Sequence, residues 1–288
     1  MAGVAPTDAT ASDAVGSQPL REVGGRPSVP AYVVEIWRRR HFAAAMPMEE
    51  MRAQHMTSVL GNLWHILNPL LLTGVYYLVF GVVLGTDRGV DNFMAFLAIG
   101  VFVYHYTQKS VMSGARSVVG NQGLIRSLQF PRAILPLAAV LAQLIAFVPP
   151  MLVIFAIALV TGESLAWSWL LLAPLVLAQG VLNLGGSLLF ARLTHKVPDM
   201  ENILPFLFRL AFYGSGVLYS VDRFIASGLG QAVFDLNPLY GYISMARWAI
   251  MGDAVSSTAL VATAAWTVLA LVVGFLYFIA GEQEYANE

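Results

Sequence analysis

Residues 133–162 read AILPLAAVLAQLIAFVPPMLVIFAIALVTG and contain no charged side chain. A helix rises about 1.5 Å per residue, and about 20 apolar residues cross the hydrocarbon core of a bilayer. This stretch is therefore predicted to span a membrane. The whole chain is 58% hydrophobic and 11% charged, with a mean hydropathy of +0.69, whereas soluble domains carry roughly 25% charged residues. The sequence predicts an all-α integral membrane protein.

Other stretches share this length and composition, and together they predict six transmembrane helices. The six cover residues 63–85, 93–116, 133–160, 166–192, 202–220 and 257–280. Residues 1–30 differ, because they are rich in Ala, Ser, Asp, Gly and Pro and contain no apolar run and no basic start. We expect a disordered tail there, followed by one membrane domain at residues 31–288.

The basic residues predict the orientation, because Arg and Lys accumulate in cytoplasmic loops. One set of loops holds Arg38, Arg39, Arg40, Arg52, Arg116, Arg126, Arg132, Arg192 and Lys196. The opposite loops hold Arg88, Arg223 and Arg247, with acidic residues beside them. Both termini, and with them the N-terminal tail, are therefore predicted to be cytoplasmic.

Composition also excludes several classes of function. The net charge of −1 argues against a nucleic-acid binder that neutralises phosphates. The chain has no cysteine, and its histidines and acids show no metal-ligand spacing. Neither Lys109 nor Lys196 stands in a phosphate-binding G-x-x-x-x-G-K-[ST] loop. If transport is driven by ATP, the motor is another polypeptide.

Two enzymatic alternatives have weak support. Ser215, between two glycines, is superficially similar to an intramembrane serine nucleophile, but no histidine follows His195. Asp87 and Asp91 could mimic the acidic pair of a lipid-linked glycosyltransferase, but their loop is short. We expect no catalytic residue in this chain.

The loop between the second and third spans contains GNQGLIRSLQFPRAILP, residues 120–136. Leu124, Ile125 and Leu128 are predicted to share one side of a short helix that Phe130 and Pro131 end, because proline cannot continue the helical hydrogen bonds. Such a helix could rest on the membrane surface. Alternatively, it could dock into a soluble partner and pass that partner's movement to the adjoining spans.

Residues 32–56 alternate apolar and charged side chains and are too polar to span. An amphipathic helix in the membrane interface fits, with Trp37 and Phe42 in lipid and Arg38, Arg39 and Arg40 toward anionic headgroups. The alternative is a solvated helix packed on its own protein.

Residues 222–253 contain two apolar pieces, 224–234 and 236–250, separated at Asn237 and Pro238. Each piece is too short to span. They predict either a re-entrant helical hairpin buried in protein or an ordinary amphipathic outer loop.

A charge within a membrane span suggests a functional site. Lys109 and Arg209 could meet an anionic headgroup, although snorkelling or ion pairing is the alternative. Aromatic side chains at span ends and middles could line a sugar path or form interface belts. The candidates for a substrate path are Trp64, Tyr76, Tyr77, Tyr104, Lys109, Arg209, Tyr213 and Tyr219.

Three segments, in this order, carry a family resemblance. The first is SVLGNLW at 58–64 with LNPLL at 67–71. The second is Asn121 with LIR at 124–126 and FPRAILP at 130–136. The third is Asp199, then LNPL at 236–239 and ARWA at 246–249. Over residues 32–288 the chain resembles the permease subunits of type-2 ABC exporters of lipid-linked polysaccharides, the Wzm- and TagG-like exporters of O-antigen, capsule and teichoic acid.

The resemblance implies roles for the segments described above. It implies that residues of the loop between the second and third spans form a coupling helix, which contacts a separate ATPase. These residues are Asn121, Leu124, Ile125, Arg126, Leu128, Phe130, Pro131 and Arg132. It implies an interface helix with Trp37, Arg38, Arg39, Arg40 and Phe42. It implies external gate helices with Phe224, Asn237, Pro238, Arg247 and Trp248.

The resemblance also implies the assembly: a homodimer in the cytoplasmic membrane with two separate nucleotide-binding subunits, which hold the ATP and Mg²⁺. The alanine-rich sequence and long N-terminal segment are most similar to the mycobacterial galactan exporter. One departure is the acidic pair Glu49 and Glu50, where the family often has a strongly basic pattern. The same fold exporting a drug or a lipid, a membrane-embedded transferase and a passive channel are the alternative functions.

Overall fold

The structure, a computed structural model, describes residues 29–41, 63–85, 90–221, 228–282 and 284–286. The described residues form helices and no strands, which confirms the predicted all-α class. The longer helices are α1 (Val29–Arg38), α3 (Trp64–Tyr76), α4 (Phe93–Arg116), α5 (Gln122–Ser127), α6 (Ile134–Val160), α7 (Leu172–Lys196), α8 (Met200–Tyr213), α10 (Gly228–Asp235), α11 (Pro238–Met251) and α12 (Ser257–Ile279). α3 continues as a π-helical stretch at Tyr77–Val83, and short 3₁₀ turns cover Val119–Asn121, Trp167–Leu171 and Glu284–Ala286.

Four helical stretches are long and apolar enough to cross a membrane: Ile66–Val83, Ile134–Val160, Trp167–Lys196 and Ser257–Ile279. They agree with four of the predicted spans. α4 matches the predicted span 93–116 in length, but it is not among the four. The count of six spans stays a prediction.

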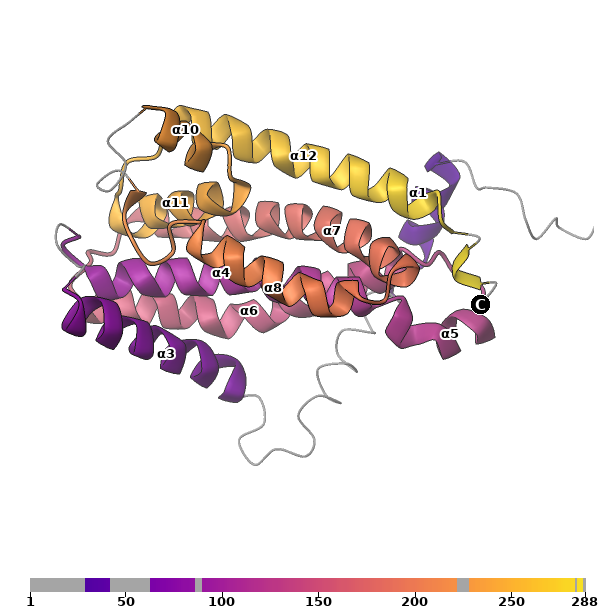
Figure 1. Ribbon diagram of the computed structural model, residues 1–288, viewed down its shortest axis with the longest axis horizontal. Coiled ribbons are helices and arrows are strands. Elements are labelled where there is room, and N and C mark those ends of the chain that lie inside the picture. Colours follow the sequence, from indigo (N-terminus) through magenta and orange to yellow (C-terminus); the bar gives the residue numbers. More distant parts are fainter. Residues whose placement is uncertain (1–28, 42–62, 86–89, 222–227, 283, 287–288) are drawn as a thin grey trace, which may run out of the picture.

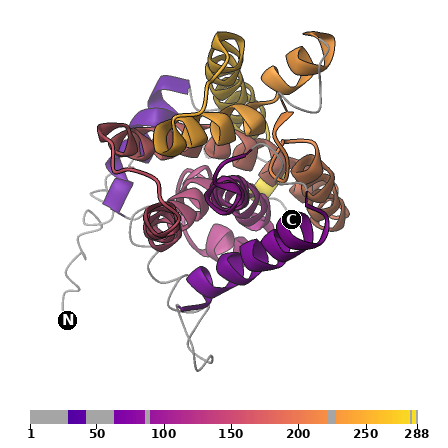
Figure 2. The ribbon, with the colours of Figure 1, turned by 90° about the vertical axis from the view of Figure 1, so that its left-hand side faces the viewer.

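α4 is the central helix of the molecule (Figure 2). It packs against α3, α6, α7, α8 and α11, and every residue from 95 to 104 is buried. Because α4 faces protein on most sides, it can carry polar residues that a lipid-facing helix could not. Gln179 of α7 donates to the backbone oxygen of Val103 at 2.9 Å and to the hydroxyl of Thr107 at 2.8 Å.

α7 and α12 make the closest helix pair, and small residues permit it. A Cβ atom added at Gly185 would lie 2.4 Å from the backbone carbon of Ala270, and one at Gly274 would lie 2.1 Å from the backbone oxygen of Gly185. The backbones of the two helices are therefore in direct contact. α7 is thus packed between α4 on one side and α12 on the other.

The predicted fifth span, residues 202–220, is wrong as a continuous helix. α8 ends at Tyr213, and at about 1.5 Å per residue it is shorter than the roughly 30 Å hydrocarbon core. The chain turns at Gly214–Gly216, where Gly216 has φ +61°. L-residues rarely adopt this conformation, so Gly216 allows the turn that follows the end of α8.

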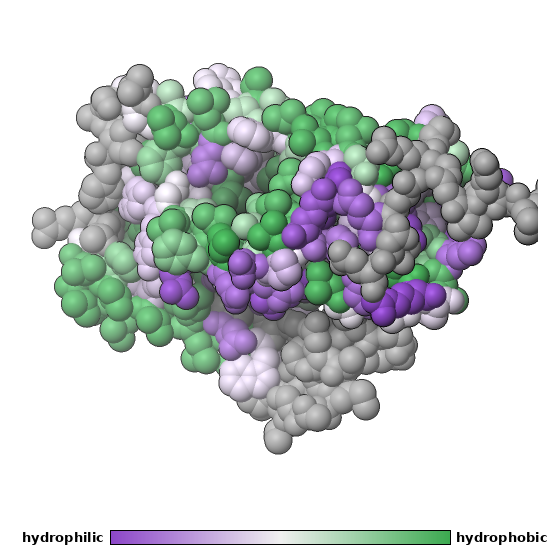
Figure 3. Space-filling model, turned by 45° about the vertical axis from the view of Figure 1, so that its right-hand side comes forward, coloured by the Kyte–Doolittle hydropathy of each residue, from purple (hydrophilic) through white to green (hydrophobic). Residues whose placement is uncertain are grey.

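The two ends of the bundle differ. α1, α5 and the C-terminal residues lie at one end, whereas α10 and the connections before α4 and α7 lie at the other (Figure 1). Hydrophilic residues gather around the first end, in front of hydrophobic residues along the helices (Figure 3). The placement of both termini on the cytoplasmic side stays a prediction.

Candidate functional site

The predicted coupling segment connects α4 to α6 at the end of the bundle where α1 also lies (Figure 1). α5 ends at Ser127, and Leu128 is extended with φ −130° and ψ 140°. The prediction that Phe130 and Pro131 end this helix is therefore wrong. Both residues are buried, Phe130 in a cluster with Ile125, Ile134 and Phe278, so the chain leaves the helix early to return to the core.

The segment has one buried side and one exposed side. Ile125 is buried and Leu124 partly buried, but Leu128 is 50% exposed. Leu128 is therefore not on the same face as Ile125, contrary to prediction, because the helix has already ended. Asn121 turns inward, since its side-chain amide donates to the backbone oxygen of Ser117 at 2.8 Å. We call the exposed side the coupling strip, formed by Val119, Gly120, Gly123, Arg126, Ser127, Leu128 and Gln129.

A buried carboxylate, Glu282, joins the segment to both ends of the chain. Its Oε2 accepts a hydrogen bond from the hydroxyl of Tyr32 in α1 at 2.7 Å. Its Oε1 accepts from the backbone N–H of Arg132 at 3.1 Å and pairs with the Arg132 guanidinium at 3.4 Å. The Tyr32 hydroxyl also accepts from the N–H of Ala133 at 3.1 Å. We call Tyr32, Arg132 and Glu282 the clasp.

Burial governs the electrostatics of the clasp. Removal from water raises the pKa of Glu282, and the hydrogen bonds from Arg132 and Tyr32 and the charge of Arg132 offset only part of this effect. Burial also raises the pKa of Tyr32, and the neighbouring Glu282 raises it further. Tyr32 is therefore a neutral donor at physiological pH. The guanidinium of Arg132 also donates to the backbone oxygen of Glu282 at 2.8 Å.

The C-terminal residues continue this contact onto α7. Glu284 pairs with Arg192 and with Lys196, each at 3.3 Å. The hydroxyl of Tyr285, a fully buried residue, donates to the backbone oxygen of Phe278 at 3.0 Å. No role was predicted from the sequence for Glu282, Glu284 or Tyr285. The available signal was the return of charged residues directly after the charge-free run of the last span.

α1, the described part of the predicted interface helix, has two faces. Tyr32 is buried, and Arg39, just after α1, donates to the backbone oxygen of Gln129 at 2.7 Å. Val33 and Trp37 point away from the bundle and are 48% and 69% exposed. The Arg40 guanidinium lies 5.2 Å from the Trp37 ring centre, and Arg38 is exposed. Phe42 lies outside the described residues.

The aromatic residues predicted for a substrate path do not share one surface. Tyr104 is buried, its hydroxyl donates to the backbone oxygen of Phe208, and its ring packs against Phe212. Tyr76 stacks on Phe212 at 5.4 Å. Tyr77 and Tyr213 are exposed, Trp64 is half-buried, and the Tyr219 hydroxyl donates to the backbone oxygen of Tyr213. Tyr104 thus belongs to the core.

The two predicted cations lie on different helices. Lys109 of α4 lines a small cleft against α6 with His105, Gln143 and Phe147. Arg209 is exposed on α8, near Tyr76. The structure does not bring the two cations together at one site.

The described residues of the predicted gate lie in α11 or directly before it, at the end of the bundle opposite the coupling strip. Asn237 caps α11 by accepting from the N–H of Leu239 at 3.0 Å, and Pro238 opens the helix. Arg247 is buried and donates to backbone oxygens of Phe96, Gly216 and Val217. Trp248 is 44% exposed. Phe224 lies outside the described residues.

The two apolar pieces of this segment form separate helices, α10 and α11, that meet at Asn237 as expected. α11 is largely buried and packs against α4, α7 and α12, whereas α10 is exposed or half-buried over most of its length, with Val233 64% exposed. The choice between a re-entrant hairpin and an outer loop stays a prediction.

Comparison with known proteins defines the class. Residues 45–251 match the family described as ABC-2 type transporter, and the chain belongs to this family of membrane proteins. The O-antigen export system permease protein RfbA of Klebsiella pneumoniae is 30% identical over 175 residues, which cover 60% of this chain and 67% of the relative.

Two further relatives extend the match. The O-antigen export system permease protein RfbA of Myxococcus xanthus is 27% identical over 207 residues, 72% of this chain and 79% of the relative. The polysialic acid transport protein KpsM of Escherichia coli is 23% identical over 252 residues, 83% of this chain and 93% of the relative. The resemblance to permeases of type-2 polysaccharide exporters is thereby confirmed.

Proposed function

We propose that the chain is the transmembrane subunit of an ATP-driven exporter that moves a polyprenyl-pyrophosphate-linked polysaccharide across the cytoplasmic membrane. The permease names of the relatives support the substrate class. The composition and the similarity noted above favour a galactan or another O-antigen-like cell-wall glycan. Both termini and the coupling strip face the cytoplasm in this proposal, where the basic residues gather.

The observation that carries the proposal is the form of the coupling segment. Its outer side is an exposed strip, whereas its inner side is fixed by Ile125, Phe130 and the clasp. A surface helix resting on lipid would need no such attachment. A lever that passes force from a soluble partner to the bundle requires both features.

The mechanism follows from this attachment. Two copies of a separate ABC subunit bind ATP and Mg²⁺, and each docks on the coupling strip of one protomer in a homodimer. Closure of the ATPase pair displaces the strip. The clasp carries the displacement to α1 and to the end of α12, and the two permeases part to admit the glycan while its lipid tail stays in the bilayer.

Leu128→Asp tests the docking role. Leu128 is 50% exposed, so the change should leave the unfolding temperature nearly unaltered while an acidic group at an apolar contact blocks the partner. We expect loss of co-purifying ATPase and at least a tenfold loss of export in cells. Leu165→Asp is the matched control, since Leu165 is 75% exposed and lies in the loop between α6 and α7 at the opposite end.

Full export by Leu128→Asp with its ATPase still bound would reject the docking role. Substrate turnover by the purified chain in the absence of any ATPase would favour a membrane-embedded transferase. ATPase-dependent transport of a drug or a lipid, with no glycan exported, would keep the fold and change the substrate.

A further inference from the structure

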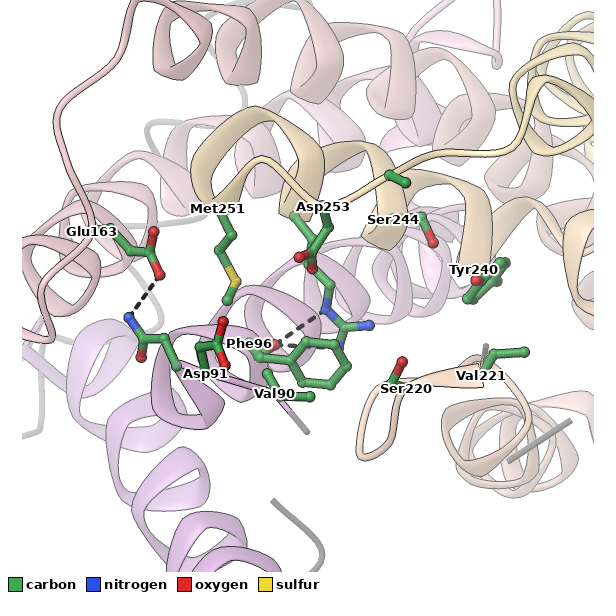
Figure 4. A pocket seen from close by; sticks show the side chains of 13 residues that line it. Val90, Asp91, Phe96, Glu163, Ser220, Val221, Tyr240, Ser244, Met251 and Asp253 are labelled. Atoms are coloured by element: carbon green, nitrogen blue, oxygen red, sulfur yellow. Dashed lines mark hydrogen bonds between the residues drawn. The ribbon is translucent and has the colours of Figure 1, made fainter. Parts of the chain in front are cut away.

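A polar cavity of about 400 Å³ lies at the end of the bundle opposite the coupling strip. Its walls come from the start of α4, the loop before α7, the turn after α8 and one face of α11 (Figure 4). Small-molecule sites commonly measure about 300–1,000 Å³. The cavity is therefore large enough for one or two sugar rings.

α11 supplies the longest wall. Tyr240, Ser244, Arg247 and Met251 line the cavity, and their spacing of four, three and four residues places them on one helix face. Gly252, with φ +79°, ends the helix and leads the chain to Asp253 at the rim. One helix thus presents an aromatic ring and a hydroxyl to the same space.

Arg247 forms a structural part of the cavity wall. Its Nη1 donates to the backbone oxygen of Gly216 at 2.9 Å, and its Nη2 to that of Val217 at 3.0 Å. Its Nε and Nη2 also approach the backbone oxygen of Phe96, at 3.4 and 3.2 Å. Because these donors are engaged, Arg247 is poorly placed to hold an anionic ligand.

The carboxylates that line the cavity disfavour a negatively charged ligand. Asp91, Glu163 and Asp253 come from three separate connections, so they disfavour a phosphate or a carboxylate ligand. No three histidine, cysteine or acidic side chains in the described ranges are grouped so that they could hold a metal ion. Spaced acceptors suit a neutral ligand that offers hydroxyl donors on several sides.

The wall at Glu163 is preorganised. The side-chain amide of Asn92 donates to Glu163 at 2.9 Å and to the hydroxyl of Thr161 at 2.7 Å. Asn92 also caps α4 by accepting from the N–H of Ala95 at 3.1 Å. A carboxylate already held in place loses little side-chain entropy when a ligand binds.

We propose that this cavity binds a neutral saccharide unit. Asp91, Glu163 and Asp253 accept hydrogen bonds from its hydroxyls, Ser220 and Ser244 supply further hydroxyl contacts, and the ring of Tyr240 packs against its C–H face. That this saccharide belongs to the exported chain rests on the function proposed above. The site would then hold part of the glycan at the exit end of each permease.

The absence of cysteine from the chain makes a direct test possible. Ser244→Cys places one thiol on the cavity wall of the full-length protein in lipid nanodiscs. Its rate of reaction with N-ethylmaleimide is measured with D-galactose, D-mannose or lactose as the probe. We expect at least one of these sugars to slow labelling threefold or more at saturation, because the bound ring covers the thiol.

Ser257→Cys is the matched control, because Ser257 is exposed near the same end but does not line the cavity. Its labelling should not change with any of the sugars. Adding Glu163→Gln or Asp253→Asn to Ser244→Cys should raise the sugar concentration for half-protection at least fivefold, because an acceptor is lost.

Three results would overturn the proposal: labelling of Ser244→Cys that no sugar slows, equal slowing of both thiols, or stronger protection by galactose 1-phosphate than by galactose. The assay needs neither ATPase nor export. If a sugar protects the thiol but the assembled complex exports no glycan, the saccharide site stands and the proposed function is rejected. If the complex exports glycan but no sugar protects the thiol, the proposed function stands and the saccharide site is rejected.

Discussion

The buried carboxylate of Glu282 accepts hydrogen bonds from three donor groups. The Tyr32 hydroxyl reaches one carboxylate oxygen, and the backbone and guanidinium of Arg132 reach the other. Glutamine offers a single acceptor oxygen, so Glu282→Gln must leave at least one of these donors unpaired. We expect a loss of about 1–3 kcal/mol in the free energy of unfolding, measured by denaturation in detergent.

Glu284→Gln provides the comparison. Glu284 is 47% exposed and pairs with the exposed Lys196 and with the buried Arg192. Because solvent screens an exposed carboxylate, we expect Glu284→Gln to change the free energy of unfolding less than Glu282→Gln does. Equal effects of the two substitutions would show that the clasp has no special place in the fold.

The clasp also predicts a pH dependence. Burial raises the pKa of Glu282 in the folded protein above the ordinary value of a glutamate, so the folded state binds more protons than the unfolded state between the two pKa values. Stability from this group is fully present below the unfolded pKa and declines as pH rises through the folded pKa. The unfolding temperature of the protein relative to Glu282→Gln should therefore fall as pH increases from about 4.5. A difference that stays constant or grows with pH would contradict this assignment.

At the scale of elements, the α7–α12 contact depends on two glycines. A methyl group at Gly185 would meet the backbone of Ala270 at 2.4 Å, and a backbone cannot move aside as a side chain can. We expect Gly185→Ala to separate the helices and to cost about 1–3 kcal/mol, measured as a lower unfolding temperature in detergent.

Gly186→Ala is the matched control on the same helix. The added methyl would meet the Val111 side chain at 3.1 Å, which can shift slightly, and alanine favours a helix by about 1 kcal/mol over glycine. A near-neutral or stabilising effect is expected. Similar destabilisation by both changes would mean that the contact is not limited by backbone approach.

The longer helices were predictable from sequence because hydropathy and length set them. The predicted spans 133–160 and 257–280 agree with α6 and α12 within a few residues. The predicted span 202–220 failed because its apolar composition hid the turn at Gly216, which the buried Arg247 holds through backbone oxygens. That contact joins distant parts of the chain and has no local signature.

The candidate site was predictable only in part, for a similar reason. Arg126 and Leu128 were assigned to the coupling segment, and both are exposed as a docking role requires. Phe130 was placed in the same set, but it fills the core. The clasp joins residues up to 250 positions apart in the chain, so the hydrophobic period of each segment could not reveal it.

In the molecule as a whole, a displaced coupling strip must move the bundle for a docked ATPase to drive transport. The clasp links the strip to α1 and to the end of α12, and α12 lies directly against α7. The opposite end, with α11 and the polar cavity, is connected to the same centre through α4. The proposed transport function therefore depends on the docking of an ATPase on the strip.

The most direct test places a single cysteine at Ser127, an exposed residue of the strip, and attaches a photoactivatable cross-linker in native membranes. We expect a cross-linked polypeptide that mass spectrometry identifies as a Walker-motif ATPase, whereas Ser257→Cys at the opposite end yields none. Absence of such an ATPase at Ser127→Cys, or an equal yield at both positions, would contradict docking on the strip and would favour an α5 that rests on the membrane surface.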